Sequence, residues 1–175
     1  LTFEIVYVLA LLSQGNMMTL HLLSVFLTGM MVVGTVILTE LIPYEVTHNR
    51  LASVLGAFAF FSIPGFYALF SEGLRSKYFM MFCGLLGVYL QLKKRPRPFL
   101  SGVFSVASGF CWQPGFIFAL ISVGLPLTSS ESKARHIVLT LCGMALSAFL
   151  ILLPIIVWGV FEPMVLEVVF VPMLT

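Results

Sequence analysis

The sequence has no aspartate and few charged residues of either sign. Charged residues make up 9% of the 175 residues and hydrophobic residues 60%, whereas an ordinary soluble domain is about a quarter charged. The seven acidic residues are all glutamates, and the mean hydropathy of the chain is +1.11. This composition excludes an ordinary soluble domain and predicts an integral membrane protein.

Several long runs lack charge altogether. Residues 5–39 carry no charged side chain, and similar runs follow at 51–71, 78–92, 98–130 and 136–161. Backbone amides in hydrocarbon must be paired within their own segment, so such runs become spanning helices, and about 20 apolar residues cover the bilayer core. We therefore predict an all-α, polytopic membrane protein in which residues 1–175 form one transmembrane region. Its expected parts are an external juxtamembrane helix at 1–12, full spans at 15–39, 51–70, 78–92 and 136–159, and a broken helical hairpin at 99–127.

Lysine and arginine orient these spans, because cytoplasmic loops carry an excess of both. The cluster Lys93–Arg97 contains four of the nine cations, so we place it in the cytoplasm of a multi-pass plasma-membrane protein. We expect it to anchor the chain at anionic lipid headgroups. Working backwards along the spans then places residues 71–77 outside.

The segment Phe99–Leu127 allows two topologies. Read as one span, it puts Lys133 and Arg135 outside, and the cation count becomes five inside against four outside. Read as a hairpin broken at Trp112–Gly115, it keeps both inside, and the count becomes seven against two. Pro114 removes a helical donor and Gly115 loosens the chain, so a break there is cheap. We favour the hairpin, with Lys133–Arg135 cytoplasmic, and expect Trp112 and Gln113 to lie deep in the protein.

Most chemical motifs are missing. The three cysteines lie in apolar runs without ligand spacing and are interpreted as packing residues. There is no glycine-rich nucleotide loop, no zinc spacing and no Ser-His-Asp set, and a nucleic-acid partner is excluded. No cofactor or metal site is therefore expected, although a divalent metal ion stays an open alternative. The sequence alone assigns no catalytic residue.

Arg75 and Lys77 are the most informative polar pair, because they oppose the positive-inside trend next to a span. Arg offers a planar fork to phosphate oxygens and Lys a compact charge, so the pair could hold the phosphate of a polyprenyl lipid. The alternative is two cations that reach out to lipid headgroups.

A transporter would need polar groups near mid-depth. The polar groups in the spans are His21, which we expect to lie near the interface, and a set of hydroxyls. These hydroxyls are as readily explained by helix packing as by a transport path. These hydroxyls belong to Thr28, Thr35, Ser105, Ser108, Thr140 and Ser147.

Several short motifs together resemble archaeal polyprenyl-phosphate-sugar glycosyltransferases, specifically the dolichyl-phosphate-mannose mannosyltransferases with the GT-C membrane fold. The similar elements cover most of the chain. They are Thr2–Tyr7, Gly15–Met17, Leu20–Leu23, Leu51–Leu55, Pro64–Phe66, Gly73–Lys77, Gly102–Gly115 and Glu167–Pro172.

The resemblance implies a definite reaction. Such enzymes move a sugar, with inversion, from a lipid phosphate to an acceptor hydroxyl on the extracytoplasmic face. A carboxylate in the first external loop, generally Asp, acts as the base, and cations stabilise the departing phosphate. The resemblance assigns this phosphate to Arg75 and Lys77. It also makes Glu4 a candidate secondary acid, with an interfacial carboxylate in water as the alternative.

The sequence departs from this pattern because it lacks any Asp. The chain begins at Leu1 and ends in an apolar run, so we expect an internal fragment whose catalytic base lies upstream. The expected function is mannose transfer from a dolichyl-phosphate donor to a glycan or glycolipid. The expected partners are therefore this lipid-linked donor, the acceptor and membrane lipid. The alternatives are part of a transporter or flippase, and a non-catalytic scaffold subunit.

Overall fold

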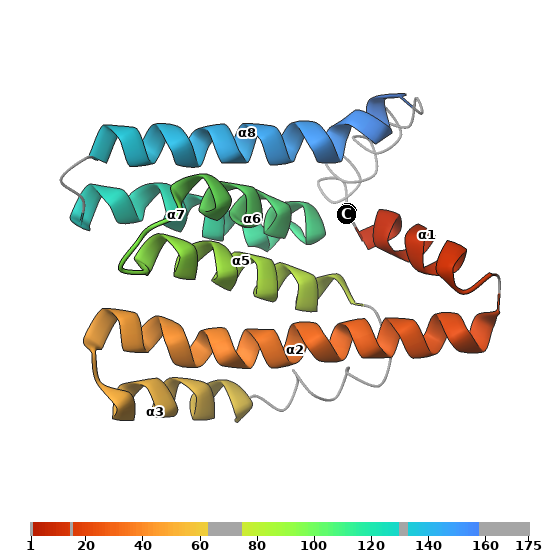
Figure 1. Cartoon of the computed structure of the whole chain (residues 1–175), viewed down its shortest axis with the longest axis horizontal. Helices are drawn as coiled ribbons and strands as arrows, with labels where there is room; N and C mark the ends of the chain where they lie inside the picture. The colour runs from red at the N-terminus through yellow and green to blue at the C-terminus, as the bar shows by residue number, and fades with distance from the viewer. Residues whose placement is uncertain (1, 15, 63–74, 130–132, 158–175) are drawn as a thin grey trace, which may run out of the picture.

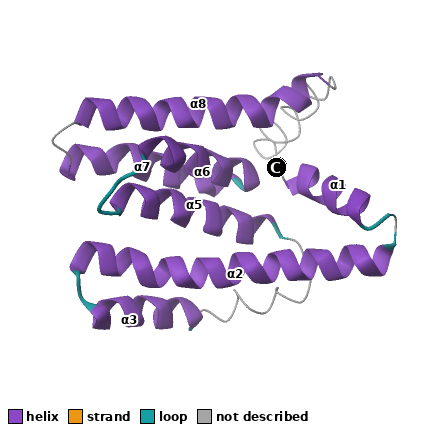
Figure 2. Ribbon diagram, viewed as in Figure 1, coloured by secondary structure: helices purple, strands orange, loops and turns teal. Residues whose placement is uncertain are grey.

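The computed structural model describes residues 2–14, 16–62, 75–129 and 133–157 of the chain. Within these ranges every regular element is a helix (Figures 1 and 2), which confirms the all-α prediction. Two helices, α2 (Met17–Thr47) and α8 (Lys133–Val157), are long and apolar enough to cross a bilayer. The predicted parts at 63–70 and 158–159 lie outside the described residues.

The first helix, α1 (Thr2–Leu12), lies over the first part of α2 (Figure 1). Gln14 takes a left-handed backbone conformation, with φ 50°, where the chain turns from one helix to the other. Asn16 then caps α2, because its side-chain oxygen accepts hydrogen bonds from the backbone amides of Met18 and Thr19 at 3.0 and 3.2 Å.

Helix α2 is longer than predicted. The span was expected to end at Thr39, but the helix runs for 31 residues, through Pro43 to Thr47, and stops at the left-handed residue His48. Proline lacks the amide that would bond the carbonyl of Thr39. Gly56 of α3 packs against both this carbonyl and the Pro43 ring. At 1.5 Å per residue α2 spans about 46 Å, which exceeds the bilayer core of about 30 Å.

Helix α3 (Arg50–Phe61) folds back along α2 (Figure 1). Asn49 caps it by accepting a hydrogen bond from the Leu51 amide at 2.9 Å. The Ser53 hydroxyl donates to the Glu40 carbonyl of α2 at 2.6 Å, which ties the two helices together at this corner.

Three further helices pack through small residues. They are α5 (Ser76–Leu92), α6 (Pro98–Cys111) and α8. Gly87 of α5 faces Ser105 of α6, and Gly102 of α6 faces the Thr140 carbonyl of α8. Gly143 of α8 in turn faces the backbone of α6. Such residues let membrane helices approach backbone to backbone, so these three helices form the closest packing among the described residues.

The segment after α6 is a helical hairpin. Helix α6 ends at Cys111, a short 3₁₀ turn covers Gln113–Gly115, and α7 (Phe116–Ser129) follows. The hydroxyls of Ser105 and Ser122 lie 2.6 Å apart, and Ser108 donates to the Gly115 carbonyl at 2.8 Å. These contacts require α6 and α7 to run antiparallel. We call residues Trp112–Gly115 the hairpin tip.

One expectation about the tip is wrong. Trp112 is 39% exposed, and Gln113 and Pro114 are also exposed; in the tip only Gly115 is buried. The tip is therefore at the protein surface in the described part of the chain, and not deep in the interior. The reason is geometric: α6 runs almost the full length of α5, so the tip emerges beside the first turn of α5.

The helix connections separate the charges. The α2–α3 turn, the α5–α6 turn and the facing ends of α7 and α8 lie at the same end of the bundle (Figure 1). The first turn of α5 lies at the opposite end, beside the hairpin tip. We call the first end the basic end, because its segments carry Arg50, Lys93, Lys94, Arg95, Arg97, Lys133 and Arg135.

Candidate functional site

The candidate site is the surface where the first turn of α5 meets the hairpin tip. The Lys77 ammonium lies over the Trp112 ring, 4.9 Å from the ring centroid, which is the geometry of a cation–π contact. Arg75 directly precedes α5, and its carbonyl accepts a hydrogen bond from the Tyr78 amide at 3.2 Å. Arg75 and Lys77 are both exposed. The two predicted cations are therefore close in the chain and adjoin an aromatic residue of another helix.

The helix itself favours an anion at this position. Arg75 is the N-cap of α5 and makes no side-chain capping bond. A helix N-terminus directs backbone N–H groups and the positive end of its dipole outward, so negative charge is stabilised there. The two cations and the helix dipole thus act in the same direction.

Trp112 belongs to the site, and sequence reasoning missed it. The sequence spacing could have predicted the contact between Lys77 and Trp112. Lys77 lies eighteen residues before Arg95, and Trp112 lies seventeen residues after Arg95. Arg95 sits in the α5–α6 turn, and antiparallel helices bring residues at equal separations from their turn to the same level. The expectation that the tip was buried concealed this pairing.

Below the cations lies an apolar cluster that joins four helices. Phe79 and Met80 of α5 and Cys111 of α6 are buried together. Partly buried apolar side chains from α1, α2 and α5 pack around them, namely Ile5, Leu27, Met31 and Met81. Burial of Phe79 and Cys111 in this cluster fixes the backbone that carries Lys77 and Trp112, because each of the two residues lies within two positions of a cluster member.

Glu4, the candidate secondary acid, is on α1, one residue before Ile5. Its backbone is part of the described helix, and Ile5 packs against the apolar cluster under the cations. This arrangement brings α1 to the same end of the bundle as Arg75 and Lys77. A role for Glu4 stays a prediction.

Metal ligands do not gather in the described part of the chain. Among these residues no group of three or more His, Cys, Asp or Glu side chains is placed to hold a metal ion. The cysteines Cys83, Cys111 and Cys142 are free. What the described site offers is therefore positive charge and an aromatic face.

Five of the six hydroxyls that a transport path would use make hydrogen bonds within one helix or inside the hairpin. Thr28 donates to the Ser24 carbonyl at 2.8 Å, and Thr35 to the Met31 carbonyl at 2.7 Å. Thr140 donates to the His136 carbonyl at 2.9 Å, while Ser105 and Ser108 bond inside the hairpin. All five residues are buried, so they pack and do not line an aqueous path. His21 is exposed on the second turn of α2.

A surface hollow with a volume of about 460 Å³ lies at the corner between α2 and α3. It is at the basic end and is not part of the site around Arg75 and Lys77. Its walls combine two opposite charges with a phenol, a hydroxyl and two aliphatic side chains: Glu40, Arg50, Tyr44, Ser53, Leu41 and Val54.

Comparison with known proteins gives a consistent result. The family model described as DolP-mannose mannosyltransferase matches residues 1–154. A protein of Haloferax volcanii called dolichol phosphate-mannose mannosyltransferase is 34% identical over 177 aligned residues. The alignment covers 99% of this chain and 37% of that protein. No solved structure matches the chain.

Proposed function

Since this chain belongs to the DolP-mannose mannosyltransferase family, we propose that the full-length protein transfers mannose from a dolichyl-phosphate donor to a glycan or glycolipid. The chain spans 37% of the length of the Haloferax volcanii relative, so the proposal concerns the complete protein. Transfer takes place on the extracytoplasmic face of a multi-pass plasma-membrane protein with a GT-C-like fold. Among the described helices, α2 and α8 are long and apolar enough to span the bilayer. We assign two further spans to the predicted segments 51–70 and 78–92, and the hairpin to α6 and α7.

The charge distribution supports this orientation. Seven cations belong to segments at the basic end, while Arg75 and Lys77 precede and begin α5 at the other end. Cytoplasmic loops are enriched in Lys and Arg, so the basic end is cytoplasmic in this proposal. The site around Lys77 and Trp112 then faces the extracytoplasmic side, where a lipid-linked mannose would be used.

The single observation that carries the proposed mechanism is the cationic site at the start of α5. Negative charge on the lipid phosphate grows as the bond to the sugar breaks, so groups that stabilise this charge lower the barrier. Arg75 would bind the phosphate through its planar fork and Lys77 through a point charge. The Trp112 ring holds the Lys77 ammonium beside the tip.

The acceptor hydroxyl must lose its proton during transfer, which is work for a carboxylate base. The described side chains of the site, Arg75, Lys77 and Trp112, include no carboxylate, and the chain has no aspartate. We therefore assign the base to a part of the full-length protein outside this chain. Glu4 is proposed as a secondary acidic group in the acceptor region, because α1 lies at the same end as the cations.

The test measures mannose transfer by the purified full-length protein, with dolichyl phosphate mannose as donor. We expect Arg75→Ala and Lys77→Ala each to lower kcat/KM for the donor by roughly 5- to 150-fold, since a charged hydrogen bond contributes about 1–3 kcal/mol and the phosphate charge grows in the transition state. Lys94→Ala removes an exposed cation at the basic end and is the matched control.

Two results would overturn the proposal. If the wild-type protein transfers no mannose, the transporter or scaffold alternative takes its place. If Arg75→Ala and Lys77→Ala behave like Lys94→Ala, the two cations are headgroup anchors and the phosphate is bound elsewhere.

A further inference from the structure

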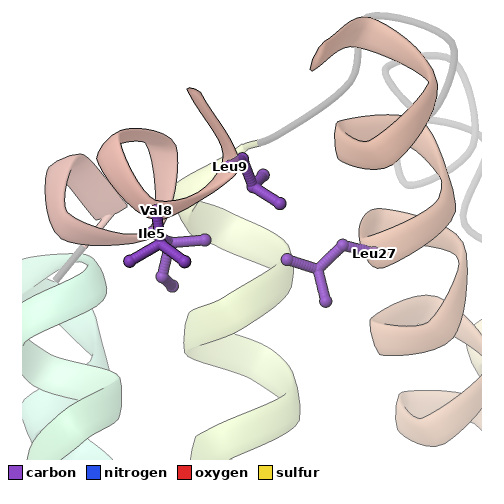
Figure 3. Close-up of a pocket in the computed structure, with 4 residues that line it drawn as sticks. All are labelled: Ile5, Val8, Leu9 and Leu27. Atoms are coloured by element: carbon purple, nitrogen blue, oxygen red, sulfur yellow. The ribbon is translucent and has the colours of Figure 1, made fainter. Parts of the chain in front are cut away.

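Two hollows in the described part of the chain have different linings. The one between α1 and α2 is lined by aliphatic side chains, which face a common space in Figure 3: Ile5, Val8, Leu9 and Leu27. The one at the corner between α2 and α3 has a volume of about 460 Å³, and its walls carry both a carboxylate and a guanidinium. The corner hollow can therefore bind a molecule through charges of both signs.

Glu40 and Arg50 supply these two charges. Both side chains are exposed, and within the described residues no ion pair joins them. Each charge can therefore pair with a bound molecule without breaking a contact inside the protein. A molecule that has one negative and one positive group is complementary to this pair.

The walls of the corner hollow are held in place by contacts of α2 and α3. The buried Ser53 hydroxyl of α3 donates to the Glu40 carbonyl of α2 at 2.6 Å. The Tyr44 ring makes an edge-to-face contact with the His48 ring, with the centroids 6.4 Å apart, which limits the positions of the Tyr44 hydroxyl. The hollow is therefore already formed before a ligand binds.

The corner hollow lies at the depth of lipid headgroups when α2 crosses a bilayer. The charge-free part of α2, residues 17–39, spans about 35 Å at 1.5 Å per residue, which is enough for the bilayer core of about 30 Å. Glu40 is the first charged residue after this part, and Tyr44 follows one turn later. Tyrosine is enriched at this boundary, because its ring is apolar and its hydroxyl is polar.

We propose that the corner hollow binds the headgroup of a membrane phospholipid that carries a phosphodiester and a primary ammonium, as phosphatidylethanolamine does. Arg50 and the Tyr44 hydroxyl donate to the phosphate, and the Glu40 carboxylate accepts from the ammonium. Leu41 and Val54 form the apolar part of the wall, beside which the acyl chains enter the bilayer. This role goes beyond mannose transfer, since the hollow is at the opposite end of the bundle from the candidate site.

The volume of the corner hollow fits such a headgroup. A phosphate with a two-carbon ammonium arm has about eight heavy atoms, and a cavity of about 150 Å³ holds the six carbons of benzene. The hollow of about 460 Å³ thus has room for the headgroup and the adjoining glycerol. The cluster Lys93–Arg97 at the same end has cations alone, so it cannot distinguish two headgroups of equal net charge.

The test compares two zwitterionic lipids, dioleoyl phosphatidylethanolamine and dioleoyl phosphatidylcholine, which differ in the N–H donors of the headgroup. Each is titrated into the purified full-length protein in detergent, and native mass spectrometry measures its Kd. The wild-type protein should bind phosphatidylethanolamine about two- to fivefold more tightly, the range for one exposed charge pair. Glu40→Leu should abolish this preference, because leucine cannot accept a hydrogen bond. Glu45→Leu is the matched control, since Glu45 is on the same helix and does not line the hollow.

The second variant tests the phosphate. Arg50→Gln should weaken the binding of both lipids alike by about two- to fivefold, because both carry the phosphate. Arg95→Gln is the matched control, since Arg95 is exposed at the same end of the bundle and does not line the hollow. Equal effects of each variant and its control would overturn the proposal, because lipids would then gather at the basic end through charge alone.

A further measurement does not depend on the variants folding. Phosphatidylethanolamine with a photoreactive diazirine at its glycerol is cross-linked to the wild-type protein, and mass spectrometry identifies the labelled residues. Labelling within residues 40–54 that excess phosphatidylethanolamine reduces more than phosphatidylcholine supports the proposal. Labelling confined to other segments overturns it, and so does equal competition by inorganic phosphate, which would indicate a site for a free anion. Neither measurement involves mannose transfer, so this inference and the proposed function can fail separately.

Discussion

The two ends of the bundle use glycine in different ways. Towards the basic end, Gly102 of α6 faces the backbone carbonyl of Thr140, and Gly143 of α8 faces the backbone of Phe99. Nearer the hairpin tip and the middle of the bundle, three helical glycines face aromatic rings instead: Gly34 faces Phe82, Gly84 faces Phe118 and Gly109 faces Phe116. Within the tip itself, Gly115 faces the Ser108 backbone. The first kind of contact cannot yield without moving a helix, whereas a ring can turn.

This difference indicates that the two ends of the bundle are packed with different rigidity. Close backbone packing at the basic end holds α5, α6 and α8 in a fixed arrangement, which in turn fixes the level at which the hairpin tip meets α5. Towards the other end the packing uses large, adaptable side chains such as Phe79 and Met80. Backbone packing of α5, α6 and α8 therefore sets the level of Lys77 and Trp112, and larger apolar side chains pack beside them.

The largest expected effect concerns which side of the membrane each end occupies. Single cysteines introduced as Lys93→Cys, Lys133→Cys and Arg75→Cys, in a full-length background without the native cysteines, are labelled in sealed vesicles by an impermeant maleimide. Lys93→Cys and Lys133→Cys should label from the same side and Arg75→Cys only from the other, because cytoplasmic loops retain the cations.

Detergent-permeabilised vesicles, in which all three positions should label, provide the control. If Lys93→Cys and Lys133→Cys label from opposite sides, residues 99–127 cross the membrane once. The two ends could then no longer be distinguished by their charge.

The next effect sharpens the contrast between the two kinds of glycine. Gly102→Ala places a methyl group against the Thr140 carbonyl and should destabilise the protein by about 1–3 kcal/mol, as overpacking does. Gly34→Ala meets only the edge of the Phe82 ring, and the gain in helix propensity of about 1 kcal/mol offsets the repacking. Thermal unfolding of the full-length protein in detergent measures both.

Equal losses of stability in the two variants would show that the ring contacts are as rigid as the backbone contacts. The proposed division into a rigid and an adaptable half would then be wrong. Gly124→Ala serves as a reference, because no atom lies near the added methyl group.

The sequence predicted the helical class well, because charge-free runs are a strong signal that local composition carries. It also predicted a helix break at Trp112–Gly115, since Pro114 and Gly115 act on their own backbone. Helix ends were predicted less well: α2 passes Glu40 and Pro43 and ends at Thr47. The helix stops where His48 takes a left-handed conformation, and it passes Pro43, against which Gly56 of α3 packs.

The candidate site was predicted only in part. Arg75 and Lys77 were singled out because their charge opposes a trend along the chain, and their role at a phosphate stays a prediction. The contact of Trp112 with Lys77 depends on which helices lie side by side, and a pattern within one segment holds no information about its neighbours. The cation–π pair of Lys77 and Trp112 requires the antiparallel register of α5 and α6.

The smallest expected effect tests whether Trp112 of the hairpin tip contributes to donor binding through its contact with Lys77. Trp112→Leu removes the ring beside the Lys77 ammonium, which at an exposed site is worth about 0.5–1 kcal/mol, so the donor KM should rise about two- to fivefold with little change in kcat. Trp112→Phe keeps an aromatic face and should restore part of the loss.

In a Lys77→Ala background the same Trp112→Leu change should have no further effect, because a coupling free energy disappears when either partner is absent. Additive losses in the double variant would mean that Trp112 acts by packing alone. The tip would then have no part in holding the cation, and the donor site would depend on α5 by itself.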